Sequence, residues 1–125
     1  MKSKYNISDS EREVMEMLWK QKEAIKQSEL LTLFAKEGKE WKRQTLNTFL
    51  ARLEEKELVV RESRMVKAAY TEEEYNCLQM KEAIGQMYGG KLSNFVLAFT
   101  KEHGISKEDE EELFRLLQER KERKE

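Results

Sequence analysis

The chain has 125 residues, of which 39% are charged, yet its formal net charge is only −1 and it holds a single cysteine. No apolar run approaches the roughly 18 to 20 residues that a membrane-spanning helix needs. One cysteine excludes both an intrachain disulfide and a cysteine-rich metal site. We therefore expect a cytoplasmic protein without metal or cofactor, made of one ordinary domain or of a small domain with a helical appendage.

The two halves of the chain differ in charge. Residues 1–71 carry 15 lysines and arginines against 12 acidic residues, a net charge of +3, whereas residues 72–125 carry 9 against 13, a net charge of −4. Because phosphates attract cations, the first half is the candidate for contact with nucleic acid.

Two helices are expected in the first forty residues. Ser8 and Glu11 have the spacing of a capping box, in which each side chain accepts from the other residue's amide, so a helix should begin there. A second, short helix is expected over residues 28–36, and Ile25 before it marks a packing anchor or a short strand. The apolar stripe of the first helix consists of Val14, Met15, Leu18 and Trp19.

A third helix, expected over residues 42–56, has two faces that differ in kind. One face is apolar and predicts a place in the core, whereas the other has no carboxylate before Glu54. A merely solvated helix face in this chain is rich in Glu, and a face that lies against phosphates and base edges must avoid acids, so DNA reading is favoured over solvation. The apolar face has Leu46, Phe49, Leu50 and Leu53; the acid-free face has Gln44, Thr45, Asn47, Thr48, Ala51 and Arg52, with Lys42 and Arg43 at its start.

A β-hairpin is expected directly after this helix. Residues 58–61 and 68–71 have β-branched or aromatic content, and they are separated by a polar stretch that contains Arg61, Arg64 and Lys67. A hairpin directly after the third helix is called a wing. Its cations Arg64 and Lys67 would bind the phosphates of the DNA backbone beside the groove. For any one of these cations, the alternative to a DNA contact is a place in an ordinary hairpin that only closes the domain.

The remaining sequence predicts three amphipathic helices, over residues 72–88, around residues 92–99, and from a cap at Ser106 onward. Three such helices cannot enclose a core by themselves, so we expect them to interlock with those of a second copy in a homodimer. The residues expected in this interface are Tyr75, Leu78, Ile84, Met87, Tyr88, Leu92, Phe95, Val96, Phe99, Leu113, Leu116 and Leu117.

Several blocks of this sequence, taken in their order and spacing, closely resemble the penicillinase-repressor family: the β-lactamase and methicillin-resistance repressors and their copper-responsive relatives. The match covers nearly the whole chain. Its blocks are residues 7–15 and 18–20, Trp41, residues 45–48, Leu53, Tyr70-Thr71, residues 88–92, 106–109 and 112–113, and Leu117.

The resemblance implies a mostly α fold with a small β-hairpin wing, in which residues 1–72 form a winged helix-turn-helix domain and residues 73–125 a helical dimerisation domain. It also implies a sequence-specific repressor that binds an inverted-repeat operator in double-stranded DNA as a homodimer and blocks transcription. By position, Gln44, Thr45, Asn47 and Thr48 would face the DNA, with Arg52 and the hairpin cations near phosphates.

The sequence departs from the family in places. Members usually start the third helix with Ser-Pro-Lys-Thr, where this chain has residues 42–45 as Lys-Arg-Gln-Thr, and usually have Gly where Glu57 stands, so the base sequence read could differ. In the antibiotic-resistance members a membrane sensor protease triggers cleavage at an Asn-Phe bond; the aligned pair here is Ala98-Phe99, with Asn94-Phe95 nearby. A membrane sensor system is thus an open partner, and the paired cysteines of the copper-responsive members are absent.

Two other classes of function compete with a repressor. An enzyme is not expected, since the chain has one histidine, His103, one cysteine, and neither a glycine-rich phosphate loop nor a set of residues with metal-ligand spacing. A winged-helix module that binds protein is the alternative, because fold does not fix function. Such a module should expose large apolar groups on the third helix, and this helix places small polar groups there.

Overall fold

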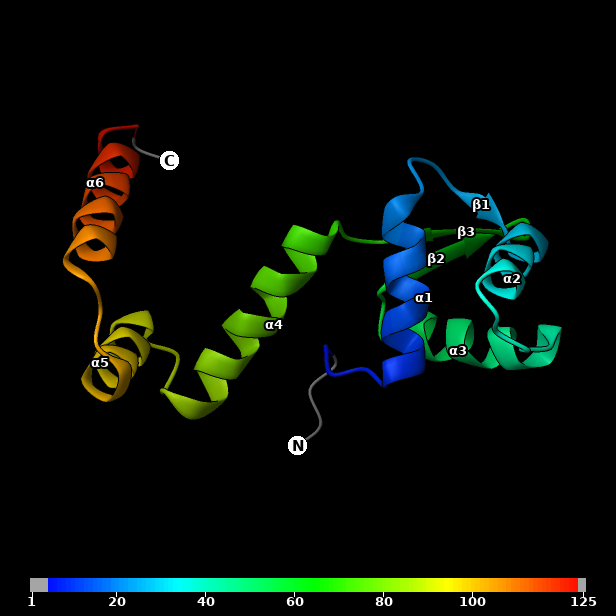
Figure 1. Ribbon diagram of the computed structural model, residues 1–125, viewed down its shortest axis with the longest axis horizontal. Coiled ribbons are helices and arrows are strands. Elements are labelled where there is room, and N and C mark those ends of the chain that lie inside the picture. The colour runs from blue at the N-terminus through cyan, green and yellow to red at the C-terminus, as the bar shows by residue number, and fades with distance from the viewer. Residues whose placement is uncertain (1–4, 124–125) are drawn as a thin grey trace. The chain divides into compact units, whose positions relative to one another are not determined.

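The computed structural model describes residues 5–123, and Figure 1 labels its helices and strands. The fold is mostly α with a small antiparallel sheet, as predicted. By the packing of its backbone the chain falls into two compact units, one ending at Glu82 and the other beginning at Ala83. The boundary expected after residue 72 stays a prediction. The elements are α1 (Asp9–Lys20), β1 (Ile25–Lys26), α2 (Gln27–Lys36), α3 (Arg43–Glu55), β2 (Val59–Glu62), β3 (Met65–Ala68), α4 (Glu72–Met87), α5 (Leu92–His103) and α6 (Lys107–Arg123).

The first helix begins at the predicted capping box. The Glu11 amide donates to the Ser8 hydroxyl oxygen at 3.1 Å, and the Ser8 amide donates to the Glu11 carboxylate at 3.0 Å. These two bonds satisfy amides that would otherwise lack partners in the first helical turn. The start of α1 is thereby fixed, and its apolar face turns toward the core, where Val14 and Met15 are completely buried.

The core of the first unit lies between α1, α2, α3 and the sheet. At one side of it Tyr75, from the start of α4, packs against Trp19 with ring centroids 5.6 Å apart and donates its hydroxyl proton to the carbonyl oxygen of Tyr5. Burial raises the pKa of the Tyr75 phenol, because the charged form would lose its water. The buried apolar residues of this core are Val14, Met15, Met17, Leu18, Leu30, Phe34, Leu46, Leu50, Leu53, Leu58, Val59, Val66 and Tyr75.

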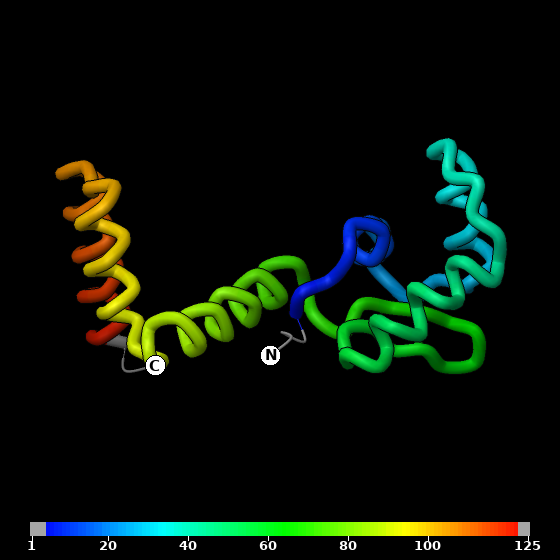
Figure 2. The backbone as a smooth tube through the Cα atoms, turned by 90° about the horizontal axis from the view of Figure 1, so that it is seen from below, coloured from blue at the N-terminus to red at the C-terminus, as the bar shows by residue number. Residues whose placement is uncertain are grey.

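The sheet has the strand order β1-β3-β2, and both pairings are antiparallel. Figure 2 traces the backbone of the hairpin formed by β2 and β3 in green. Its second strand covers residues 65–68, so the expected strand at 68–71 was wrong by three residues. The turn is only two residues long, with Ser63 and Arg64 both at positive φ, 53° and 68°. Two-residue turns with two positive φ values normally contain Asn-Gly, so the pair Ser63-Arg64 does not predict such a turn.

The end of α3 holds a residue in the left-handed conformation that is not glycine. Glu57 has φ 65°, and just beyond it the Leu58 amide donates to the Leu53 carbonyl at 2.9 Å. This helix-ending motif favours Gly. We expect Glu57→Gly to raise the free energy of unfolding by about 0.5–1 kcal/mol, because relief of strain at the β-carbon outweighs the added freedom of the unfolded chain. Urea denaturation followed by circular dichroism measures this change.

A matched substitution gives the opposite sign. Glu55→Gly places glycine inside the last turn of α3 and should lower the free energy of unfolding by about 0.5–1 kcal/mol. A Glu57→Gly variant that is no more stable than the unmodified chain would show that the backbone at this position carries no strain.

The second unit contains the end of α4 and the two helices α5 and α6. The Asp109 amide donates to the Ser106 hydroxyl oxygen at 3.0 Å, so the predicted cap of the last helix is confirmed. The rings of Tyr88 and Phe95 meet at 5.5 Å, which links the end of α4 to α5. Among the described residues of α5 none is buried, although this helix carries several large apolar side chains.

Within residues 5–123 no helix is both long and apolar enough to cross a membrane.

Candidate nucleic-acid interface

The two faces predicted for the third helix are present in α3. Leu46, Leu50 and Leu53 are buried, and Phe49 packs against Trp41 with ring centroids 5.0 Å apart. Burial of this face holds the helix against the core and leaves the acid-free face outward. On that face Gln44, Asn47, Thr48, Ala51 and Arg52 are exposed, and Thr45 is half-buried.

The beginning of α3 is electrically positive. Lys42 occupies the N-cap position without a capping hydrogen bond from its side chain, and the first turn contains no acidic residue. Lys42 and Arg43 are both exposed there. The partial positive charge of the helix N-terminus therefore adds to two side-chain cations, a combination that favours a negatively charged ligand.

A hollow of about 690 Å³ lies between this helix start, the beginning of α2 and the hairpin turn. Among the residues that the structure describes, three cations line it, Lys26, Arg43 and Arg64, and no carboxylate does. The Gln27 amide donates to the Arg64 carbonyl at 3.0 Å and thereby fixes the turn against α2. The other residues of its lining are Gln27, Ser28, Leu31, Leu46, Ser63 and Met65.

The structure separates the two hairpin cations that the sequence grouped together. Arg64 lies in the turn and lines the hollow, whereas Lys67 lies within β3, opposite Val60, where both residues are exposed. Lys26 also lines the hollow, although no sequence pattern predicts it there. It arrives there because β1 pairs with β3, with Lys26 opposite Met65.

Arg61 is the residue that sequence reasoning placed least well. It alternates with the exposed Val60 and pairs with the buried Val66, so it points from β2 toward α3. Its Nη1 donates to Asn47 Oδ1 at 2.8 Å, while Nε and Nη2 donate to Glu54 Oε1 at 3.2 and 2.9 Å. The side chain is only 21% exposed. It therefore works inside the protein, holding two side chains of α3 together.

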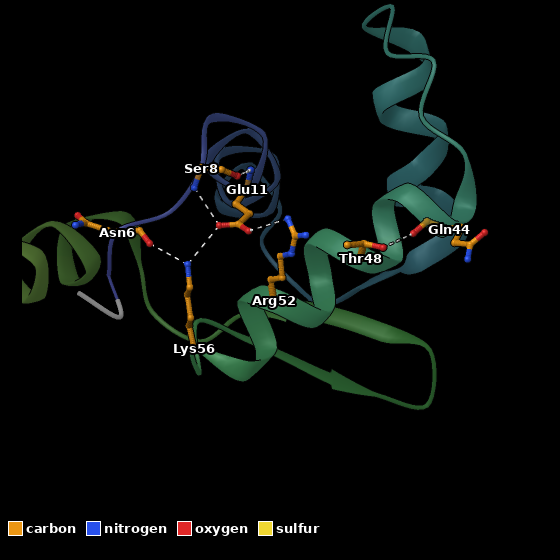
Figure 3. Close-up of polar contacts among 7 residues, drawn as sticks. All are labelled: Asn6, Ser8, Glu11, Gln44, Thr48, Arg52 and Lys56. Carbon is orange, nitrogen blue, oxygen red and sulfur yellow. Dashed lines mark hydrogen bonds and ion pairs between the residues drawn. The ribbon is translucent and has the colours of Figure 1, made fainter. Parts of the chain in front are cut away.

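Arg52, on the acid-free face, also has a partner within the chain. Its Nη1 lies 4.0 Å from the buried carboxylate of Glu11, and Lys56 Nζ lies 3.5 Å from the same carboxylate (Figure 3). Figure 3 also shows Gln44, Thr48 and Arg52 along α3, with the Thr48 hydroxyl donating to the Gln44 carbonyl at 3.0 Å. Because the Arg52 side chain is 59% exposed, its guanidinium is still accessible to a second anion.

The residues expected in a dimer interface are mostly exposed in the single chain. Tyr75 is completely buried in the first unit, where it packs within its own chain, and its place in an interface between chains stays a prediction. Ile84 is also buried, and Leu78, Tyr88 and Phe95 are half-buried. The exposed members of the set are Met87, Leu92, Val96, Phe99, Leu113, Leu116 and Leu117, and Leu97 and Phe114, which the sequence did not select, are exposed beside them.

Three helices, of which the third has an outward polar face, and a small sheet that contains the hairpin define a winged helix-turn-helix protein, a class that binds DNA. The sequence profile of the penicillinase repressor family matches residues 7–119. A penicillinase repressor of Bacillus licheniformis is 31% identical, and the alignment covers 99% of this chain and 98% of that protein. The chain therefore belongs to the penicillinase repressor family of DNA-binding transcriptional regulators, and membership agrees with the expectation of a protein that is not an enzyme.

Proposed function

We propose that this protein represses transcription by binding an inverted-repeat operator as a homodimer, with α3 of each subunit in the major groove. The observation that carries the proposal is the exposed, acid-free face of α3, flanked by a hollow with three cations. Amide and hydroxyl groups match base edges, and cations match the phosphates on either side. The proposed DNA contacts are Lys42, Arg43, Gln44, Thr45, Asn47, Thr48, Arg52, Arg64 and Lys67, and we add Lys26 to this proposal because it lines the hollow.

The apolar faces of α5 and α6 support the homodimer. Leu92 and Phe114, for example, are 62% and 64% exposed, and large apolar side chains exposed in such number are unfavourable in water. A second copy of the same helices would cover it around a two-fold axis, and that axis suits two inverted half-sites. Sedimentation equilibrium should give a dimer at micromolar concentration, and a monomer would remove the two-fold argument.

Binding to DNA from upstream of the protein's own gene tests the proposal directly. Fluorescence anisotropy should show an affinity that survives an excess of competitor DNA and falls steeply as salt is added. A repressor of this kind acts in the cytoplasm. If no duplex is bound specifically, a winged-helix module that binds protein becomes the better description.

The link to a membrane sensor protease stays a prediction. The pair Asn94-Phe95 lies inside α5, and the Phe95 ring packs between Tyr88 and Phe99.

Single residues of α3 should divide into two kinds. We expect Arg52→Ala to weaken binding to specific and random DNA alike, because a cation near phosphates does not read sequence. Asn47→Ala and Thr48→Ala should instead change the preferred base, with roughly 1–3 kcal/mol at stake for a good base contact. Anisotropy against the operator and against single-base variants measures both. Equal losses on specific and random DNA from all three changes would contradict these roles.

A further inference from the structure

We infer that Arg61 is a positioning residue: it fixes which end of the Asn47 amide faces the DNA. It thereby determines which base Asn47 prefers to bind. This inference rests on the proposed function. Its basis is the hydrogen bond of 2.8 Å from Arg61 Nη1 to Asn47 Oδ1. A guanidinium has donors only, so an amide turned around would set its own donor, Nδ2, against those of Arg61.

The guanidinium is itself held in place. Nε and Nη2 donate to Glu54 Oε1, and Nη1 also lies 3.5 Å from Gln27 Oε1. Asn47 and Glu54 are seven residues apart on α3, two turns along the same face, and Arg61 bridges them from β2. Bonds from a charged donor are the stronger kind, and two of them to Glu54 fix the plane of the fork. The Asn47 side chain is exposed, and Arg61 therefore holds the orientation of its amide from the side that faces the protein.

The fixed orientation of the Asn47 amide has a consequence for base recognition. With Oδ1 held by Arg61, the end of the amide turned away from Arg61 is the donor Nδ2. In the major groove guanine and thymine present acceptors, O6, N7 and O4, whereas cytosine presents the donor N4. At the base that Asn47 contacts, the repressor should prefer an acceptor over cytosine by about tenfold.

The test begins with a duplex selected by the unmodified full-length protein from a randomised pool. Asn47→Ala identifies the base pair that Asn47 contacts, and anisotropy then compares all four base pairs there. In Arg61→Met the preference for an acceptor over cytosine should fall from about tenfold to less than threefold, since the freed amide can turn its carbonyl to cytosine. Preferences at other base pairs should stay unchanged, and thermal unfolding monitors the fold of each variant.

A second variant moves two readouts in opposite directions. Glu54→Ala leaves the charge of Arg61 in place but removes its anchor, so discrimination against cytosine should fall. The same change deletes an acid next to the DNA, so affinity for every duplex should rise. The matched control Arg64→Met removes a cation of the hollow and should lower affinity for all sequences without altering the preference at the Asn47 base pair.

The outcomes separate the two proposals. If the unmodified protein selects no sequence, the proposed function fails and this inference fails with it. If it selects an operator but Arg61→Met and Glu54→Ala keep its preference at the Asn47 base pair, only the role of Arg61 is overturned. A uniform loss in Arg61→Met with the weaker salt dependence of Arg64→Met would make Arg61 a phosphate contact, which also overturns it.

Discussion

Glu11→Ala should lower the free energy of unfolding by about 2–3 kcal/mol, although it removes only one charged side chain. The Glu11 residue is 3% exposed, and its carboxylate serves three neighbours at once: the Ser8 amide, Lys56 and Arg52 (Figure 3). Truncation leaves the first turn of α1 without half of its capping box. It also leaves Lys56, only 29% exposed, facing an empty space where its counter-charge had been.

The size of this effect is limited by what Lys56 keeps. Its Nζ still donates to the Asn6 carbonyl at 2.9 Å, and the partly exposed ammonium can regain water, so the full cost of an unpaired buried charge does not arise. Thermal unfolding at fixed protein concentration should show a midpoint lower by about 10 to 20 °C for a domain of this size.

Two variants of α1 act as controls. Glu11→Gln keeps the capping bond and loses only the charge, so it should fall between Glu11→Ala and the unmodified chain. Glu13→Ala breaks an ion pair of 2.8 Å with Lys39 whose two side chains are 40% and 34% exposed, and such a surface pair contributes only about 0–1 kcal/mol. Similar losses from Glu11→Ala and Glu13→Ala would mean that the buried network contributes no more than an ordinary surface pair.

The sequence was informative wherever a feature depends on neighbours within about seven residues. The capping box of Ser8 and Glu11 and the buried side of α3, with Leu46 and Leu50, follow from spacing alone, because a helix brings residues three or four apart together. These features decide where α1 starts, which side of α3 is buried and hence which side of α3 is left for DNA.

The residues that sequence reasoning missed depend on contacts across the fold. Lys26 enters the hollow only through the pairing of β1 with β3, and Arg61 reaches Asn47 only because β2 packs against α3. Tyr75 follows the same rule: its helical pattern suggested a place between subunits, yet it fills a space beside Trp19 that only the folded chain creates. No local pattern carries such information.

The hollow between α2, α3 and the hairpin turn allows a quantitative prediction of DNA binding. Replacing Lys26, Arg43 and Arg64 together by Ala removes three cations from each subunit, hence six from a dimer on its operator. Each lost phosphate contact lowers the slope of log affinity against log salt by about 0.9, so the slope should fall by roughly five. Affinity at low salt should drop at least about a hundredfold for specific and random DNA alike, which anisotropy at several salt concentrations measures.

The control removes the same charge from another part of the same unit. Lys20, Lys22 and Lys36 are exposed and take no part in the lining of the hollow, so their joint replacement by Ala gives a protein of identical net charge. If phosphates occupy the hollow, this control should keep nearly the whole salt slope. Equal losses of salt slope in the two triple variants would mean that DNA binding depends only on the overall charge of the first unit. The hollow would then have no role in binding the DNA backbone.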